Sequence, residues 1–404
     1  MEKLMSLVGL ATMVGIAFLI STNKKKIQWV TVLSGILLQL VFGLLILKTT
    51  IGQSVFDGAR NFFTSILNFT NEGSAFIFGG LTDASKYGFL FFTMVLPTII
   101  FMSALMSVLY HIGIMQIVIK LTAKIMVKVM GTSGAESLAA AANIFAGQTE
   151  APLVIKPYID RMTKSELLAL MTGGMATVAG GVLAAYVGMG IDAGHLLAAS
   201  VMSAPAALVI AKLMVPETEE SVTKGVVKVE FPRTTVNLID AAATGASDGL
   251  KLALNVGGML LAFIALIALV NGALSMIGGW FYYPQLSLEL ITGYLFSPLA
   301  FLMGVPWEDC VQVGSLLGKK TIVNEFVAYL DLQQQLSTLK PRSVIIATYA
   351  LCGFSNFSSI AIQIGGIGTI APERRQDLAA LGIKSLIGGT LACLMTACIA
   401  GLFI

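Results

Sequence analysis

Charged side chains are scarce in this chain of 404 residues. Asp, Glu, Lys and Arg make up only 12% of it, whereas 56% of its residues are hydrophobic. Soluble proteins carry about 25% charged residues, so this composition cannot cover a surface that faces water. The sequence therefore predicts a polytopic membrane protein. The same composition excludes a secreted disulfide scaffold, a disordered chain and a nucleic-acid-binding protein.

Cysteine and histidine are also rare. The two histidines, His111 and His195, each stand alone at the end of an apolar segment, so a histidine-based metal site is not expected. HExxH, P-loop and aspartate-rich metal motifs are absent from the sequence. The four cysteines lie in apolar stretches without a CxxC pattern and are predicted to be buried packing residues: Cys310, Cys352, Cys393 and Cys398.

Long apolar runs dominate the remaining sequence. A helix needs about 20 apolar residues to cross a bilayer. Eight runs meet this length and predict an all-α fold with eight transmembrane helices, at about 4–20, 28–47, 88–110, 165–190, 192–213, 250–278, 342–365 and 378–404.

Lysine and arginine predict the orientation, because they are enriched in cytoplasmic loops. If the turn at Lys24–Lys26 is cytoplasmic, most basic residues share its side and both termini lie outside. The cytoplasmic group then also contains Lys120, Lys124, Lys128, Lys156, Arg161, Lys164, Lys212, Lys224, Lys228, Arg233, Arg374 and Arg375. The outer group is smaller and contains Lys48, Arg60, Lys86, Lys340 and Arg342.

Three stretches are not expected to span. Residues 51–70 mix aromatic and charged side chains, which predicts an interfacial helix on the outer surface. Residues 115–130 place Lys120, Lys124 and Lys128 at helical spacing, which predicts a basic amphipathic helix on the cytoplasmic surface. Residues 216–249 are the most polar part of the chain and are predicted to form a cytoplasmic connection.

Two further segments, 134–160 and about 296–332, are apolar but interrupted by polar residues, glycine and proline. Neither half of either segment is long enough to cross, which predicts two re-entrant hairpins. Each is followed by a helix with its own polar break and then by one more spanning helix. With the orientation above, the hairpins enter from opposite sides and form an inverted repeat. Such paired interruptions indicate a substrate site near the midplane of a secondary transporter.

Glu150 and Glu325 are the carboxylates expected nearest that midplane, where a charge costs at least ~3 kcal/mol. They predict polar substrate contacts or proton coupling, with hairpin-stabilising hydrogen bonds as the alternative. Amide and hydroxyl groups around them suit a neutral, flat solute with several hydroxyls. Asn143, Thr177 and neighbouring carbonyls could bind a small cation, although an Asn and a Thr alone are more often explained by helix–helix hydrogen bonds.

An enzymatic alternative rests on Gly131-Thr132-Ser133-Gly134, which matches the GxSG pattern of intramembrane serine proteases. However, Ser133 and Glu136 also form the pattern of a helix capping box. The only later histidine, His195, is expected on the opposite side of the membrane. The protein is therefore not expected to be an enzyme. A channel is a further alternative, which the inverted repeat and the midplane carboxylates disfavour.

The most distinctive segments are GQTEAPLVIKPYI (147–159), NEFVAY (324–329) and GFSNFSSIAI (353–362). In these segments the chain resembles the concentrative nucleoside transporters. The likeness extends through ESLAAAANIF (136–145), PETE (216–219) and PERR (372–375) and covers essentially the whole length. The resemblance implies a symporter in the bacterial cytoplasmic membrane that works as an elevator, with eight spanning helices and two opposed hairpins.

The resemblance also implies a homotrimer and a division into scaffold and transport domain. The implied divisions are 1–114 and 115–132 for the early scaffold and the interfacial helix, 133–214 for the first repeat, 215–285 for the connection and sixth helix, and 286–404 for the second repeat. Nucleosides and membrane lipid are the implied partners, and nucleic acid is not one.

Site residues are implied by position. Four residues would address the nucleobase: Gln148, Thr149, Glu150 and Val182. Four would bind or pack against the rest of the nucleoside: Glu325, Phe354, Asn356 and Ser359. Sodium, the implied coupling ion, would be held by Asn143, Thr177 and the carbonyls of Ala146 and Val178. The GQTE form with Asn143 resembles the sodium-coupled branch, and a proton-coupled symporter of the same fold is the alternative.

Overall fold

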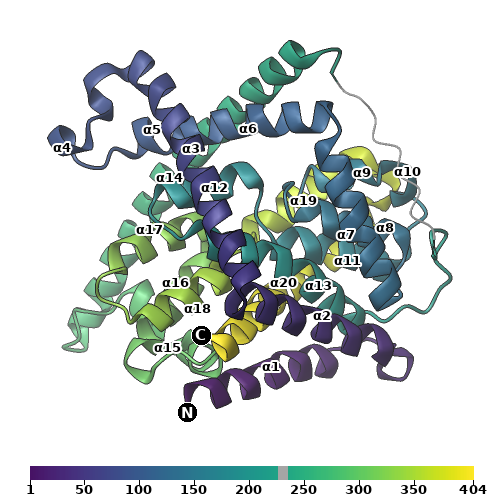
Figure 1. Cartoon of the computed structure of the whole chain (residues 1–404). Helices are drawn as coiled ribbons and strands as arrows, with labels where there is room; N and C mark the ends of the chain where they lie inside the picture. Colours follow the sequence, from purple (N-terminus) through teal and green to yellow (C-terminus); the bar gives the residue numbers. More distant parts are fainter. Residues whose placement is uncertain (226–234) are drawn as a thin grey trace.

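The computed structural model describes residues 1–225 and 235–404, and this part of the chain contains helices but no strands (Figure 1). Lys228 and Arg233, predicted to be cytoplasmic, lie outside the described residues. Within the described part, seven helical segments are long and apolar enough to cross a membrane: Glu2–Leu19 (α1), Trp29–Lys48 (α2), Phe91–His111 (α5 and α6), Lys164–Gly188 (α11 and α12), Ala193–Met214 (α13), Leu238–Trp280 (α14) and Pro372–Phe403 (η4 and α20).

The one remaining predicted span, 342–365, falls on two shorter helices. These are α18 (Pro341–Leu351) and α19 (Phe357–Ile370), separated by residues 352–356. Asn356 caps α19 because its side chain accepts a hydrogen bond from the backbone N–H of Ser359 at 2.9 Å. The polar break predicted for this helix therefore has a local cause.

Helices α11, α13 and α20 form the centre of the protein. In the most apolar stretch of α13, 89% of the residues are buried, whereas only 11% are buried in the most apolar stretch of α14. Alanine and glycine allow close packing at the centre: Gly389 of α20 lies against Met175 of α11, where an added Cβ would come within 2.3 Å of the Met175 Cβ. The apolar face of α14 remains exposed in the single chain, as expected for a helix that meets lipid or another chain.

Helix α14 overturns part of one prediction. Residues 216–249 were expected to be a connection, but α14 begins at Leu238 and runs unbroken to Trp280. The Asn237 side chain caps it by accepting from the N–H of Asp240 at 2.9 Å. The first turns of α14 are polar, which conceals them from a search for apolar runs, although residues such as alanine and leucine favour a helix there.

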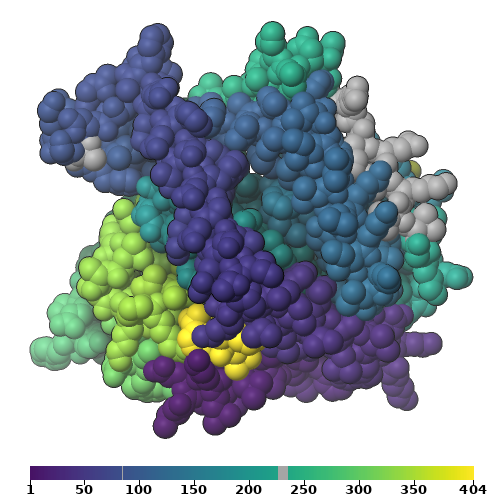
Figure 2. Space-filling model, viewed as in Figure 1, coloured from purple at the N-terminus to yellow at the C-terminus, as the bar shows by residue number. Residues whose placement is uncertain are grey.

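Two amphipathic helices match the segments predicted to lie at the interfaces. Helix α3 (Thr50–Phe78) extends the predicted 51–70 helix and crosses the front of the molecule (Figures 1 and 2). Helix α7 (Ile114–Met130) buries Met115, Ile119 and Ala123 and leaves its three lysines exposed. Their placement at the membrane surfaces remains a prediction.

Two helix units carry the interrupted segments. The first contains α8 (Gly134–Asn143), α9 (Ala151–Val154), α10 (Lys156–Ile159), α11 (Lys164–Ala176), α12 (Gly180–Gly188) and α13. The second contains α16 (Cys310–Ile322), α17 (Glu325–Gln335), α18, α19 and α20 (Arg375–Phe403). Residues 296–302, predicted to open the second interrupted segment, instead belong to α15 (Leu288–Leu302), which packs along α16.

Candidate substrate and cation sites

The residues predicted to hold a cation lie where two helices end. Asn143 is the last residue of α8, and Thr177 directly follows the last residue of α11. These helices contact one another, and all four predicted residues are buried. Because the carbonyl end of a helix carries a partial negative charge, two such ends near one another favour a cation.

The Asn143 side chain supplies a further observation. Neither its Oδ1 nor its Nδ2 has a hydrogen-bond partner, although both atoms are fully buried. A buried polar atom normally has a partner, so an unpartnered amide oxygen indicates a missing one. Oxygen ligands of this kind suit Na⁺. The nearby Thr177 hydroxyl donates to the Gly173 carbonyl at 2.9 Å and still has lone pairs to offer. The residues present therefore fit a sodium ion.

A second cluster surrounds Glu325, the first residue of α17. Its carboxylate accepts hydrogen bonds from Asn356 Nδ2 at 3.0 Å and from the Tyr186 hydroxyl at 3.2 Å. Only 4% of Glu325 is exposed. The predicted ribose-binding pair of Glu325 and Asn356 is therefore in direct contact, and two donors stabilise the buried carboxylate.

Gln148 joins the first unit to the second. Its Nε2 donates to the Ser359 hydroxyl at 3.0 Å, and its Oε1 accepts from Gln363 Nε2 at 3.1 Å. The neighbouring Thr149 packs against Gly366, where an added Cβ would come within 2.8 Å of the threonine methyl group. Two of the predicted nucleobase residues, Gln148 and Thr149, thus lie against α19, which carries Ser359.

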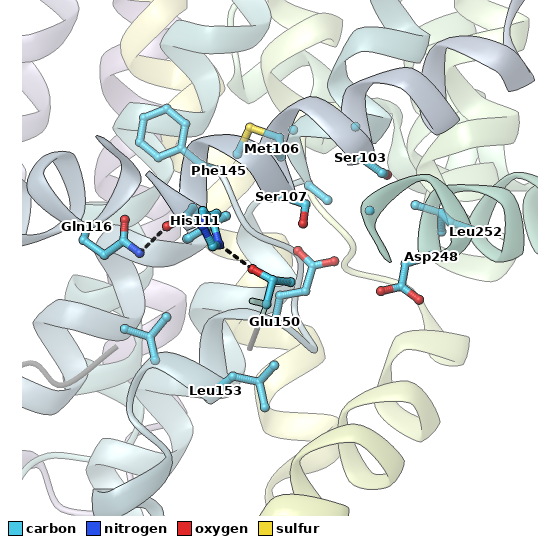
Figure 3. A pocket seen from close by; sticks show the side chains of 17 residues that line it. Ser103, Met106, Ser107, His111, Gln116, Phe145, Glu150, Leu153, Asp248 and Leu252 are labelled. Atoms are coloured by element: carbon cyan, nitrogen blue, oxygen red, sulfur yellow. Dashed lines mark hydrogen bonds between the residues drawn. The ribbon is translucent and has the colours of Figure 1, made fainter. Parts of the chain in front are cut away.

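Glu150 points elsewhere. It lines a cavity of about 370 Å³ between the first unit and helices α6 (Leu96–His111) and α14 (Figure 3). One of its oxygens accepts the backbone N–H of Gly147 at 2.8 Å. Figure 3 shows the carboxylates of Glu150 and Asp248 and the Ser107 hydroxyl directed into the same space. The cavity is large enough for a drug-sized ligand.

The remaining predicted residues have different surroundings. Val182 is buried in α12 and is not among the described residues that line the cavity. Phe354 is partly buried, and its backbone N–H donates to the Thr177 carbonyl at 3.2 Å. The break in the second unit is therefore hydrogen-bonded to the break in the first.

Sequence reasoning missed three side chains: Tyr186, Gln363 and Asp248. Gln363 had a recognisable pattern, because it follows Ser359 by four residues and Asn356 by seven on one face of an apolar helix. Tyr186 follows Val182 by four residues and lies on the same face of α12 in the same way. Asp248 had no such pattern, because it sits in the polar start of α14.

The hydroxyl of Ser133 has structural partners. It donates to Glu166 Oε1 at 2.5 Å and accepts from the N–H of Glu136, which confirms the predicted capping box. His195 lies at the start of α13, where its ring contacts Tyr349 and Phe56. The four cysteines are free and buried, as predicted.

Comparisons with known proteins agree with this architecture. Three family descriptions match successive parts of the chain: Na+ dependent nucleoside transporter N-terminus at residues 8–81, Nucleoside recognition at 92–193, and Na+ dependent nucleoside transporter C-terminus at 195–401. Together these matches extend over nearly the whole sequence.

Individual proteins are similar over essentially the whole of this chain. An uncharacterized transporter of Haemophilus influenzae is 50% identical, with 100% of this chain and 98% of that protein aligned. Solute carrier family 28 member 3 of Rattus norvegicus is 46% identical over 99% of this chain and 59% of its own length.

Solved structures of the transporter CNTnw are 47% identical to this chain. The inward-facing, substrate-bound state has a TM-score of 0.95 and covers 100% of this chain and 98% of that one. A double variant in an outward-facing state has a TM-score of 0.96 and covers 100% and 99%. Sequence, fold and the grouping of polar residues thus lead to one conclusion: this chain is a multi-pass membrane protein that belongs to the concentrative nucleoside transporter family.

Proposed function

We propose that the protein is a Na⁺-coupled symporter that concentrates nucleosides into the cell. The observation that carries the proposal is the pair of unpartnered, buried polar atoms of Asn143 at the joined ends of α8 and α11. Asn143 and Thr177 would hold the ion with the carbonyls of Ala146 and Val178. The bound ion would contribute its positive charge, so both its gradient and the membrane voltage would drive uptake, at about 2.3 kcal/mol per charge per 100 mV.

The nucleoside would bind in the polar groups between the two units. Ribose hydroxyls can donate to Glu325 and accept from Asn356, replacing the contacts that these groups make with one another and with Tyr186. Gln148, Thr149 and Glu150 would address the base, with Val182 behind it. Ser359 would assist on the ribose, and Phe354 would pack against the nucleoside. Each group offers polarity without a net positive charge, which suits a neutral substrate.

Coupling would run through the two broken helices. The Phe354 N–H donates to the Thr177 carbonyl, and the Gly180 N–H donates to the Phe145 carbonyl at 2.9 Å. Fixing the backbone at Thr177 for the ion therefore also fixes the backbone that presents Phe354 and Asn356. A coupling free energy of about 1–3 kcal/mol is typical of such linked sites.

The whole-chain arrangement that we propose has eight membrane crossings, with α18 and α19 together making the seventh. The α8–α10 and α16–α17 segments would enter the membrane as opposed re-entrant hairpins. The two units would move as a transport domain against a scaffold of early helices and α14, in a homotrimer of the bacterial cytoplasmic membrane with both termini outside. The exposed apolar face of α14 supports contact with lipid or another chain.

Uptake of radiolabelled uridine and adenosine into proteoliposomes tests the proposal. One set of vesicles carries an imposed Na⁺ gradient and the other an imposed pH gradient. We expect concentrative uptake with Na⁺ alone. Uptake driven only by the pH gradient would favour the proton-coupled alternative, in which Glu150 or Glu325 carries the proton. Absence of uptake of both nucleosides under both gradients would contradict the substrate assignment.

A further inference from the structure

The helices α8 and α11 begin with two similar capping boxes. Ser133 caps α8, and its backbone N–H donates to Glu136 Oε1 at 2.7 Å. Thr163 caps α11, and its backbone N–H donates to Glu166 Oε2 at 2.9 Å. A capping box satisfies the free N–H groups of one helix and needs no partner outside it. Here, however, the two boxes are linked to one another.

Two separate connections link the boxes, one direct and one through Lys212 and Glu217. On one side, the Ser133 hydroxyl donates to Glu166 Oε1 at 2.5 Å. On the other side, Lys212 Nζ, near the end of α13, contacts Glu136 Oε2 at 2.7 Å and Glu217 Oε2 at 3.1 Å. The same Glu217 oxygen accepts the Thr163 hydroxyl at 2.9 Å. These contacts close a polar ring of six residues: Ser133, Glu136, Lys212, Glu217, Thr163 and Glu166.

The polar ring is largely buried, and its cation Lys212 forms an ion pair with Glu136 and hydrogen bonds with Glu217 and Ser165. The side chains of Lys212 and Glu136 are only 9% and 2% exposed. Lys212 Nζ donates to the Ser165 hydroxyl at 3.0 Å, and Glu166 also accepts from the Ser221 hydroxyl at 2.5 Å. One ammonium group therefore contacts two of the three carboxylates of the ring, so removing it leaves buried negative charge without compensation.

The ring lies at the opposite ends of the helices that carry the proposed cation ligands. Helix α8 spans ten residues from Gly134 to Asn143, and α11 spans thirteen from Lys164 to Ala176, immediately before Thr177. A helix is nearly rigid along its axis and rises about 1.5 Å per residue. A displacement of one N-terminus relative to the other is therefore transmitted to Asn143 or Thr177. Ligand sites tolerate errors of only about 0.5 Å.

We infer that the polar ring sets the register of α8 and α11 and so positions Asn143 and Thr177 for the cation, with Lys212 as a positioning residue that touches neither ion nor nucleoside. The inference rests on the proposed cation site. It predicts that damage to the ring weakens Na⁺ binding specifically, rather than only lowering the stability of the protein.

Thermal unfolding of purified protein, titrated with NaCl at constant ionic strength in choline chloride, measures this without transport. We expect Lys212→Met to raise the Na⁺ concentration for half-maximal stabilisation about tenfold. Lys212→Arg keeps the positive charge and should raise this concentration much less. Arg342→Met is the matched control, because Arg342 is a partly buried cation of the second unit that holds the carbonyls of Gly304 and Gly401. It should lower the unfolding temperature and leave the Na⁺ concentration dependence unchanged.

Milder variants keep the test decisive if Lys212→Met does not fold. Ser133→Ala and Thr163→Ala each remove one link of the ring, and each should raise the half-maximal Na⁺ concentration about threefold. A lower unfolding temperature with wild-type Na⁺ dependence in these variants would show that the ring is only structural and overturn the inference. A wild-type protein whose unfolding does not respond to Na⁺ at all would instead overturn the cation site on which the inference rests.

Discussion

The two helix units have similar arrangements of helices, but different contacts hold the N-termini of their first helices, α8 and α16. In the first unit, the polar ring joins the N-termini of α8 and α11. In the second, Asp309 at the start of α16 joins α18, since its Oδ2 accepts from the Lys340 N–H at 3.0 Å and the Ser343 hydroxyl at 2.5 Å. The neighbouring Glu308 adds an exposed ion pair with Lys340. The more extensive set of contacts belongs to the unit that carries Asn143. This difference agrees with the proposal that the polar ring positions Asn143 and Thr177 for a cation.

The acidic residues of the two units differ in accessibility, and here the second unit has the more tightly held side chain. Glu325 is buried and held by Tyr186 and Asn356, whereas Glu150 opens into the cavity with Gly147 as its backbone donor. A ligand must replace existing partners at Glu325 but can approach Glu150 directly. The second unit therefore offers a buried cluster of polar groups, while the first offers an accessible carboxylate.

The largest effect is expected for Glu325→Gln. Tyr186 and Asn356 donate to different oxygens of Glu325, and an amide replaces one of these acceptors with an NH₂ donor. Hydrogen bonds to a charged group are worth about 1.5–3 kcal/mol each. We expect uridine uptake at subsaturating concentration to fall about 100-fold, since each 1.4 kcal/mol corresponds to a factor of ten. Glu308→Gln, at an exposed carboxylate of the same region, serves as the control. Unchanged uptake by Glu325→Gln would contradict the ribose assignment.

Asn143→Ala should affect the ion more than the nucleoside. Removing an amide oxygen from a cation site costs about 1.5–2.5 kcal/mol, by analogy with a hydrogen bond to a charged group. We expect the Na⁺ concentration for half-maximal uptake to rise at least tenfold, with the maximal rate recovered in part at high Na⁺. Initial uptake rates measured over a range of Na⁺ concentrations check this. The helix–helix hydrogen-bonding alternative gains support if the Na⁺ dependence stays at the wild-type value.

Asp309→Ala tests whether the polar ring and the Asp309 contacts have different roles. It removes the acceptor for the Lys340 N–H and the Ser343 hydroxyl, and a lost buried hydrogen bond costs about 1–3 kcal/mol. We expect a lower unfolding temperature with unchanged half-maximal Na⁺ concentration. The salt-titrated unfolding measurement separates the two quantities. A Na⁺ shift as large as that of Lys212→Met would erase the proposed distinction between the units.

The smallest effect is expected at the contact between α3 and the start of α13. Arg60 Nη2 lies 2.8 Å from Asp192 Oδ2, but the two side chains are 50% and 31% exposed, so the pair contributes at most about 1 kcal/mol. Arg60→Ala should change uptake less than twofold and lower the unfolding temperature only slightly. A large loss of uptake would show that this contact matters for the transport cycle itself.

This contact also has a defined pH dependence. Burial opposes ionisation of Asp192, but hydrogen bonds from the His195 backbone and from Arg60 outweigh it and hold the pKa of Asp192 below its ordinary value. A lowered folded-state pKa stabilises the protein at pH values above the ordinary pKa and is lost as the pH falls through the lowered one. The Arg60 effect should therefore be constant from pH 8 to 6, which unfolding at several pH values checks.

Much of the architecture is local and was predictable. Scarce charge and long apolar runs determine a membrane protein, and seven of the eight runs match helices of spanning length in the described part of the chain. Capping patterns such as that of Ser133 and Glu136 act within four residues, so the sequence also reveals where α8 begins. The polar start of α14 was missed, because apolar runs identify residues that lie in the membrane and do not identify polar residues that are also helical.

Tertiary structure decided which polar residues meet. Gln148 and Gln363 are 215 residues apart, Tyr186 and Glu325 are 139 apart, and Lys212 reaches a carboxylate of α8. No local pattern encodes these pairs, because they depend on how whole helices pack. The sequence alone determines that polar groups lie buried in apolar helices and therefore need partners. Packing selects the partner, since a buried polar group is stable only where another helix brings a donor or acceptor within about 3 Å.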